Sequence, residues 1–201
     1  MLDNEKFITI HTNPIDLFKI WFELAIKSET NNPNAMTLSS ISDQYKPNSR
    51  IVLLKYFDNK GFIFYTNSNS KKGKDIAFNS FVSLNFYWKT QKKQIRIEGE
   101  AEIINSKDAN EYFNSRPRES QIGALASNQS AVLSDRSLLI KKTDEIRKKY
   151  ENTEIPRPNY WNGYLVKPNL IEFWQEMQNR LHDRVEYKKI ENKWVSNRLF
   201  P

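Results

Sequence analysis

Apolar and polar residues alternate along several short stretches of the chain, a pattern that is typical of β-strands with one buried face. The alternation is clearest over residues 81–88 and 94–104, and in the second stretch the polar face carries Gln94, Arg96 and Glu98. Weaker strand patterns cover residues 35–42, 161–167, 170–176, 181–187 and 193–199. Short connections between consecutive strands favour an antiparallel barrel or sandwich over a parallel sheet.

Turn residues between these strands predict three hairpins. Residues 50–57 and 62–66 are rich in β-branched and aromatic types, and the turn sequence DNKG at 58–61 lies between them. We expect a second hairpin around residues 168–169, where Pro-Asn separates two strand patterns, and a third that pairs the last two strands. On a regular strand, Arg50 and Lys55 would lie on opposite faces.

Helical patterns are predicted at residues 14–30, 70–79, 106–112, 117–126 and 134–150. Asn13 followed by Pro14 marks the start of the first helix, whose apolar residues recur at helical spacing and should pack on the core. Tyr112 and Arg116 are four residues apart, so a continuous helical path would place them on one face. At 201 residues, the chain is expected to form a single domain, with residues 1–13 as an N-terminal arm.

Composition excludes several kinds of site. The chain has only 5 glycines and neither of the glycine-rich phosphate motifs, which argues against a doubly wound dinucleotide fold. It has no cysteine, and its 2 histidines are far apart in sequence, so thiol catalysis is excluded and no metal site is expected. We find neither a signal peptide pattern nor an apolar run of membrane-spanning length, so we expect a cytoplasmic protein without membrane association.

The formal charge of +7 indicates anionic partners, which could be nucleic acid, a membrane surface or small phosphorylated molecules. Most of the lysine and arginine clusters are short and typical of solvated faces. A basic nucleic-acid-binding β-barrel would show a continuous basic stripe with exposed stacking aromatics. Here the aromatic residues alternate into predicted core positions, so no nucleic-acid partner is expected.

Two stretches carry candidate chemistry. Residues 65–72 form a loop rich in hydroxyl and amide groups that ends in two lysines at a predicted helix start, which suits a phosphate monoester. A solvated hairpin end with unrelated lysines is equally compatible with this stretch. If residues 180–184 form a strand, Arg180, His182 and Arg184 share a face, and a bound anion or an electron-rich ring would explain that grouping. An edge strand with inward-turned charges is the alternative, which the local pattern slightly favours.

Taken together, these stretches resemble the pyridoxine (pyridoxamine) 5′-phosphate oxidase family, flavoproteins of vitamin B6 metabolism. The motifs that carry the resemblance stand in the order and at the spacing usual for the family. They are RIVLLK at 50–55, FYTN at 64–67, YFNSRPRESQIGA at 112–124, NQS at 128–130, EFWQ at 172–175 and RLHDR at 180–184. The likeness runs from about Pro14 to the C-terminal RLFP.

The resemblance implies a mainly β fold with flanking helices, a split β-barrel that binds FMN at the interface of a homodimer. It implies that Arg50 and Lys72 hold the FMN phosphate with help from Thr66 and Lys71. Gln94, Trp174 and Arg184 would border the flavin, and the partner subunit would contribute Gln129 and Ser130. Further cofactor contacts are expected from Ile51, Val52, Leu53, Leu54, Lys55 and Tyr65.

The resemblance also implies a reaction and a substrate site. Pyridoxamine or pyridoxine 5′-phosphate would be oxidised by O2 to pyridoxal 5′-phosphate with release of H2O2, and of ammonia from the amine. A hydride would pass from the substrate C4′ carbon to the flavin N5 atom. The substrate phosphate would be held by Lys55, Tyr112, Arg116 and Ser120, and Arg180 and His182 would lie over the pyridine ring as the catalytic residues.

Two positions depart from the family pattern. Lys71 stands where arginine is common, so a bidentate guanidinium is replaced by a point charge and FMN binding should be somewhat weaker. Residues 1–13 hold no counterpart of the Arg-Arg-x-Tyr segment that closes over the substrate in the family. A split-barrel flavin protein with another substrate is the nearest alternative, although a plain flavin reductase would not need the phosphate-holding set.

Overall fold

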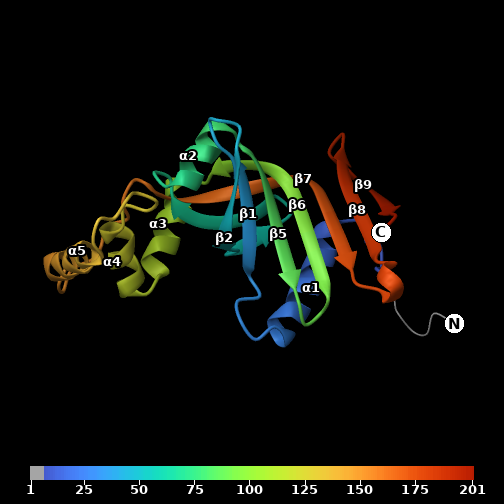
Figure 1. Ribbon diagram of the computed structural model, residues 1–201, viewed down its shortest axis with the longest axis horizontal. Coiled ribbons are helices and arrows are strands. Elements are labelled where there is room, and N and C mark those ends of the chain that lie inside the picture. The colour runs from blue at the N-terminus through green and yellow to red at the C-terminus, as the bar shows by residue number, and fades with distance from the viewer. Residues whose placement is uncertain (1–6) are drawn as a thin grey trace.

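The framework of the protein is one antiparallel sheet of nine strands, seen in a computed structural model that describes residues 7–201 (Figure 1). The strands are β1 (Ala35–Ile41), β2 (Pro47–Leu53), β3 (Tyr56–Asp58), β4 (Gly61–Asn67), β5 (Phe81–Trp88), β6 (Lys93–Ile103), β7 (Trp161–Gln175), β8 (Asp183–Ile190) and β9 (Lys193–Leu199). They are paired in the order β2-β1-β5-β6-β7-β4-β3, and β8 and β9 continue from the second half of β7. The expected mainly β, antiparallel fold is confirmed.

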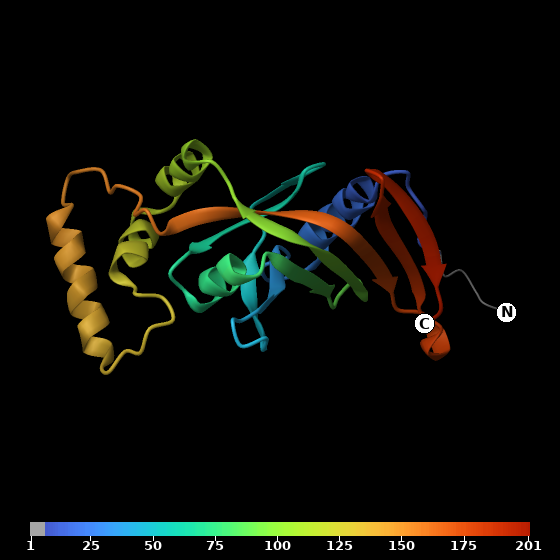
Figure 2. The same ribbon diagram turned by 90° about the horizontal axis from the view of Figure 1, so that it is seen from above.

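Five helices flank the sheet, and a short 3-10 helix (Gln178–Arg180) precedes β8. They are α1 (Pro14–Ser28), α2 (Lys71–Phe78), α3 (Ser106–Ser115), α4 (Arg118–Ala126) and α5 (Arg136–Lys149). Helices α3 to α5 lie at one end of the long axis, and β8 and β9 lie at the other end in both views (Figures 1 and 2). Within residues 7–201, no helix is long and apolar enough to cross a membrane.

The main core lies between α1 and one face of the sheet. Asn13 caps α1 by accepting a hydrogen bond from the backbone of Ile15, and Pro14 occupies the first turn, as predicted. Phe18 is fully buried and meets the rings of Phe62 and Phe86 at centroid distances of 4.9 and 5.4 Å. The apolar side chains of β5 and β6 point into this core. Because side chains alternate along a strand, the polar side chains of β5 and β6 point to the opposite face of the sheet.

The predicted strand at residues 50–57 is two strands. β2 ends at Leu53 and pairs with β1, whereas β3 pairs with β4 in the hairpin predicted around residues 58–61. Between them the chain changes partner, since the backbone of Leu54 donates to Asn34 and that of Lys55 donates to Ile63. The apolar pattern of the sequence continues across this change of partner strand. For that reason the sequence predicts one strand where the structure has two.

The predicted hairpin around residues 168–169 is wrong, because β7 runs through it as one strand. Glu98 pairs with Leu170 and Gly99 pairs with Pro168, so one extra residue of β7 forms a bulge at this point. The proline therefore falls where the ladder is already interrupted, and its missing N–H group costs little. A Cβ atom at Gly99 would lie 2.2 Å from the carbonyl oxygen of Lys167, which explains why the residue of β6 opposite Pro168 is a glycine.

Residues 180–182 do not continue β8, so the face of three cations that a strand over residues 180–184 would present is not formed. Arg180 ends the 3-10 helix with a positive φ of 62°, and β8 begins only at Asp183. The pairing of β8 with β9 is confirmed. Helix α3 likewise ends at Ser115, because a residue that precedes proline disfavours helical geometry, and Arg116 is extended. Residues 1–6 of the expected N-terminal arm lie outside the described residues.

Candidate functional site

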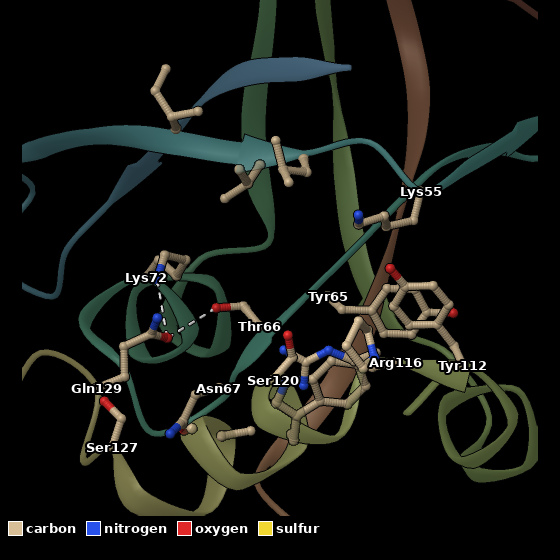
Figure 3. Close-up of a pocket in the computed structure, with 17 residues that line it drawn as sticks. Lys55, Tyr65, Thr66, Asn67, Lys72, Tyr112, Arg116, Ser120, Ser127 and Gln129 are labelled. Atoms are coloured by element: carbon tan, nitrogen blue, oxygen red, sulfur yellow. Dashed lines mark hydrogen bonds between the residues drawn. The ribbon is translucent and has the colours of Figure 1, made fainter. Parts of the chain in front are cut away.

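A cavity of about 610 Å³ lies between the sheet and the helices α2 to α4 (Figure 3). Most of the residues expected to bind cofactor or substrate line it. These are Ile51, Val52, Leu53, Lys55, Tyr65, Thr66, Lys72, Tyr112, Arg116, Ser120 and Gln129. They come from the end of β2, from β4, and from the segments around three helices, so segments far apart in sequence form one cavity.

One end of the cavity holds a buried lysine. Lys72 lies in the first turn of α2, whose start is capped by Ser70, and its Nζ atom donates to Ser70 Oγ and to Gln129 Oε1 at 3.4 Å each. Thr66 Oγ1 donates to the same oxygen of Gln129 at 3.2 Å. Burial, and then the nearby charge of Arg50, lower the pKa of Lys72. Its hydrogen-bond partners are neutral oxygens, so a bound anion would offset both the burial of the ammonium group and its repulsion by Arg50.

Arg50 stands beside this end on β2, although it is not among the lining residues. Its Nη1 atom donates to Ser40 Oγ at 2.6 Å, and its Nη2 atom lies 3.4 Å from Asp75 Oδ2. Asp75 is buried in α2 and also accepts hydrogen bonds from Ser40 and Asn48. Burial lowers the pKa of Arg50 even though Asp75 opposes the shift. The guanidinium is thus held in place by Ser40 and Asp75, and Asn48 supports Asp75; the sequence did not single out any of these three residues.

The other end of the cavity carries Lys55, Tyr112 and Arg116 (Figure 3). The ring of Tyr65 stacks on Tyr112 with centroids 4.0 Å apart and on Trp161 with centroids 5.1 Å apart. Burial, with smaller effects of Tyr112 and Asp108, raises the pKa of Tyr65 to about 12, so its hydroxyl is a neutral donor at physiological pH. Tyr112 and Arg116 both line the cavity, but the continuous helical path expected to bring them together is not formed, because Arg116 lies beyond the end of α3.

Arg116 is supported by aromatic rings. Its guanidinium lies 4.8 Å from the ring centroid of Trp161 and 5.7 Å from that of Phe113. Its Nη1 atom is buried and has no hydrogen-bond partner among the described residues. Gln121 fixes the backbone here, because its Nε2 atom donates to the carbonyls of residues 113, 114 and 116. Sequence reasoning did not identify Trp161 as a site residue. The only sign of Trp161 in the sequence was its position at the start of a predicted strand.

A second cluster of expected site residues lies outside this cavity. Gln94, Trp174 and Arg184 are aligned across β6, β7 and β8, and the ring of His182 lies 4.7 Å from that of Trp174. Arg184 Nε donates to the buried carboxylate of Glu172 at 2.8 Å, which raises the pKa of Arg184. None of these residues lines the cavity. The described chain therefore divides the expected site residues between two clusters.

Three further expected positions lie apart from the rest of the set. Gln129, which is expected to act on the site of the partner subunit, contacts Thr66 and Lys72 within its own chain. Its neighbour Ser130 lines an adjoining cavity of about 420 Å³ together with Lys71, which is exposed. The sequence could not show that the loop after α4 folds back onto β4. Leu54 lies in the main core and is not a lining residue.

Comparisons with known proteins agree with this arrangement. Residues 22–150 match the family model described as pyridoxamine 5′-phosphate oxidase, and residues 161–201 match that of the pyridoxine 5′-phosphate oxidase C-terminal dimerisation region. A pyridoxine/pyridoxamine 5′-phosphate oxidase of Acaryochloris marina is 47% identical over 96% of this chain and 88% of that relative. The corresponding Haemophilus influenzae protein is 44% identical over 95% of this chain and 90% of its own length.

Solved structures give the same fold. PhzG from Burkholderia lata 383, in complex with tetrahydrophenazine-1-carboxylic acid, superposes with a TM-score of 0.90 at 29% identity and covers 95% of this chain and 94% of its own. A pyridoxamine 5′-phosphate oxidase-related, FMN-binding protein from Nostoc punctiforme shares the fold with a TM-score of 0.74 at 11% identity over 96% of this chain and 100% of its own. These likenesses confirm the expected split β-barrel. From its sequence and its fold, the chain belongs to the pyridoxine/pyridoxamine 5′-phosphate oxidase family.

Proposed function

We propose that the protein is an FMN-dependent oxidase that converts pyridoxamine or pyridoxine 5′-phosphate to pyridoxal 5′-phosphate with O2 as acceptor. One observation carries the proposal: the cavity has a cationic group at each end, Lys72 and Arg116, and neither pairs with a carboxylate among the described residues. Two such ends fit two phosphate monoesters, one on a cofactor and one on a substrate.

The end at Lys72 fits the phosphate of FMN. Arg50 and Lys72 would supply the charge, while the hydroxyl of Thr66 would donate a hydrogen bond. Only one phosphate is accommodated by this charge, and the chain has no glycine-rich turn for a pyrophosphate, so FMN is favoured over FAD. Bound FMN would supply the hydride acceptor and the route of electrons to O2.

The opposite end fits the substrate phosphate. Arg116 would present buried N–H groups, Lys55 an exposed ammonium group, and Tyr112 and Ser120 hydroxyl groups. Fixing the phosphate there would orient the rest of the substrate along the cavity, and orientation is the main contribution that a protein makes to such a reaction. Arg180, at the end of the 3-10 helix, and His182, in the second cluster, are proposed to contact the pyridine ring.

We further propose that a homodimer completes each site. The second cluster, defined by Gln94, Trp174, His182 and Arg184, lies on the face of the sheet opposite the main core, because the neighbouring residues Ile95, Phe173 and Val185 point into that core. Three of these residues fall within the matched dimerisation region, residues 161–201. In a twofold dimer, this cluster of one subunit can meet the cavity of the other. The cytoplasmic location expected from the sequence stays a prediction.

The test is direct. The purified protein should be yellow, should take up FMN in preference to FAD, and should form pyridoxal 5′-phosphate and H2O2 from pyridoxamine or pyridoxine 5′-phosphate. The substrates without phosphate should react far less well, because the end at Arg116 then lacks its anion. Protein that stays colourless with added FMN would contradict the cofactor. Protein that binds FMN but oxidises neither phosphate ester would indicate a flavin enzyme with another substrate.

A further inference from the structure

We propose that Trp161 is a positioning residue for Arg116: its indole face holds the guanidinium in place of a carboxylate, so that the whole positive charge stays available to the substrate phosphate. The inference rests on the proposed function, which places the substrate phosphate at Arg116. It assigns a role to a residue that lies 45 positions away in sequence and that no motif marked.

The support of Arg116 differs from that of the five arginines, half of those in the chain, that form ion pairs. A carboxylate lies within ion-pair distance of each of Arg50, Arg96, Arg147, Arg184 and Arg198. Arg116 instead lies over Trp161 at 4.8 Å, and its Nη1 atom is buried without a partner among residues 7–201. Burial lowers the pKa of Arg116, because the buried cation has lost solvation. Such a group is poised for an anionic ligand.

Trp161 is itself held independently of Arg116. It begins β7, where it pairs with Asn67, and its side chain is 6% exposed in a buried cluster with Phe113, Ile122 and Ile155. Arg157 clamps its backbone, because Nη1 of Arg157 donates to the Trp161 carbonyl at 2.6 Å while Nε donates to a side chain of α3 at the same distance. The indole is therefore a fixed platform that links β7 to α3.

An aromatic platform has a chemical advantage at this position. A carboxylate would neutralise the guanidinium and occupy its N–H edges, whereas a ring attracts the cation through its face and leaves the edges free. The platform should thus raise the affinity for a phosphorylated ligand specifically. It should not affect FMN, whose proposed phosphate site at Lys72 lies at the other end of the cavity.

The test is a double-mutant cycle on the FMN-loaded enzyme, with Trp161→Leu, Arg116→Ala and the double variant. For pyridoxamine 5′-phosphate, Trp161→Leu should raise KM roughly 3- to 30-fold, the range expected from loss of a cation–π contact. The kcat and the Kd of FMN should change by less than about twofold, and kcat/KM for unphosphorylated pyridoxamine should be similarly insensitive. In the Arg116→Ala background, Trp161→Leu should add little, because the two residues act as a unit.

Matched variants separate positioning from general loosening. Trp194→Leu removes a tryptophan that also has a lysine near its ring, 5.9 Å away on β8, and it should leave the ratio of the two substrates unchanged. Trp161→Phe keeps a smaller ring and should raise KM by roughly two- to fivefold, again only when Arg116 is present. If Trp161→Leu does not fold, the phenylalanine variant carries the cycle.

Two results would overturn the inference: additive effects of Trp161 and Arg116, or equal losses for the phosphorylated and unphosphorylated substrates. The activity of the wild-type protein distinguishes failure of the proposed function from failure of this inference. If the proposed function is wrong, the wild-type protein oxidises neither substrate. In that case the same cycle is measured on the Kd of inorganic phosphate. Independence of the two residues in phosphate binding would still reject the role of Trp161.

Discussion

The side-chain oxygen of Gln129 lies 3.4 Å from Nζ of Lys72, and it also accepts a hydrogen bond from Thr66 at 3.2 Å. This contact joins the loop after α4 to the first turn of α2 and orients the ammonium group. We predict that Gln129→Ala raises the Kd of FMN by roughly 3- to 10-fold, the loss expected for one hydrogen bond. Quenching of flavin fluorescence measures it. Asn128→Ala, which alters the exposed neighbour, is the control, and an unchanged Kd for Gln129→Ala would contradict the prediction.

The buried carboxylate of Asp75 stabilises Arg50 before any phosphate is bound. Asp75→Asn should therefore lower the free energy of unfolding of the FMN-free protein by roughly 1–3 kcal/mol. Saturating FMN should recover part of this loss, because its phosphate compensates the charge of Arg50. Thermal unfolding with and without FMN measures both values. Asp43→Asn, at an exposed turn position, is the control. Equal losses in the two states would show that Arg50 does not meet the cofactor phosphate.

The lowered pKa of Lys72 predicts the pH dependence of FMN binding. Burial disfavours the charged lysine, so the FMN-free protein releases this proton at a lower pH than the unfolded chain does, and its stability rises with pH in that window. A phosphate dianion favours the protonated form, so the affinity for FMN should fall as the pH rises through the same window, which begins below the ordinary lysine value of 10.5. The Lys72→Met variant should bind FMN weakly, and its affinity for FMN should not show this fall with rising pH. An identical pH profile for the variant would refute the assignment.

Mixed dimers test whether each site is shared between subunits. Lys72→Ala should inactivate the cavity, and Arg184→Ala should inactivate the second cluster. In a heterodimer of the two variants, one site combines both defects and the other combines two intact halves. Random mixing should therefore restore about a quarter of the wild-type activity if the halves come from different subunits. Activity that stays at the level of the separate variants would place both clusters in one subunit's site.

The segment from Arg180 to Arg184 should divide between two ligands. Arg184 is anchored on β8 by Glu172, so Arg184→Ala should weaken FMN binding. Arg180 is exposed, and His182 packs against Trp174, so their alanine variants should lower kcat/KM at saturating FMN while the Kd of FMN is kept. Each effect should be roughly ten- to hundredfold. Equal loss of FMN in all three variants, or full kcat/KM in Arg180→Ala, would contradict the division.

Local patterns predicted most of the elements. The strand expected at residues 81–88 is β5, Phe81–Trp88, and the helix expected at 70–79 is α2, Lys71–Phe78, with Ser70 as its cap. These two predictions are correct because alternation and helix capping depend only on residues that are a few positions apart in sequence. The motifs also identified most of the residues that line the cavity.

The sequence by itself thus determined most of the strands, the helices and the kinds of side chain at the site. Only the tertiary structure decided which of them meet. It alone showed that β7 passes through Pro168 opposite Gly99, that Trp161 supports Arg116, and that Arg184 lies outside the cavity that holds Lys72. The physical reason is that alternation and capping are set by neighbours in the chain, whereas strand partners and contacts between helices depend on packing among residues that are distant in sequence.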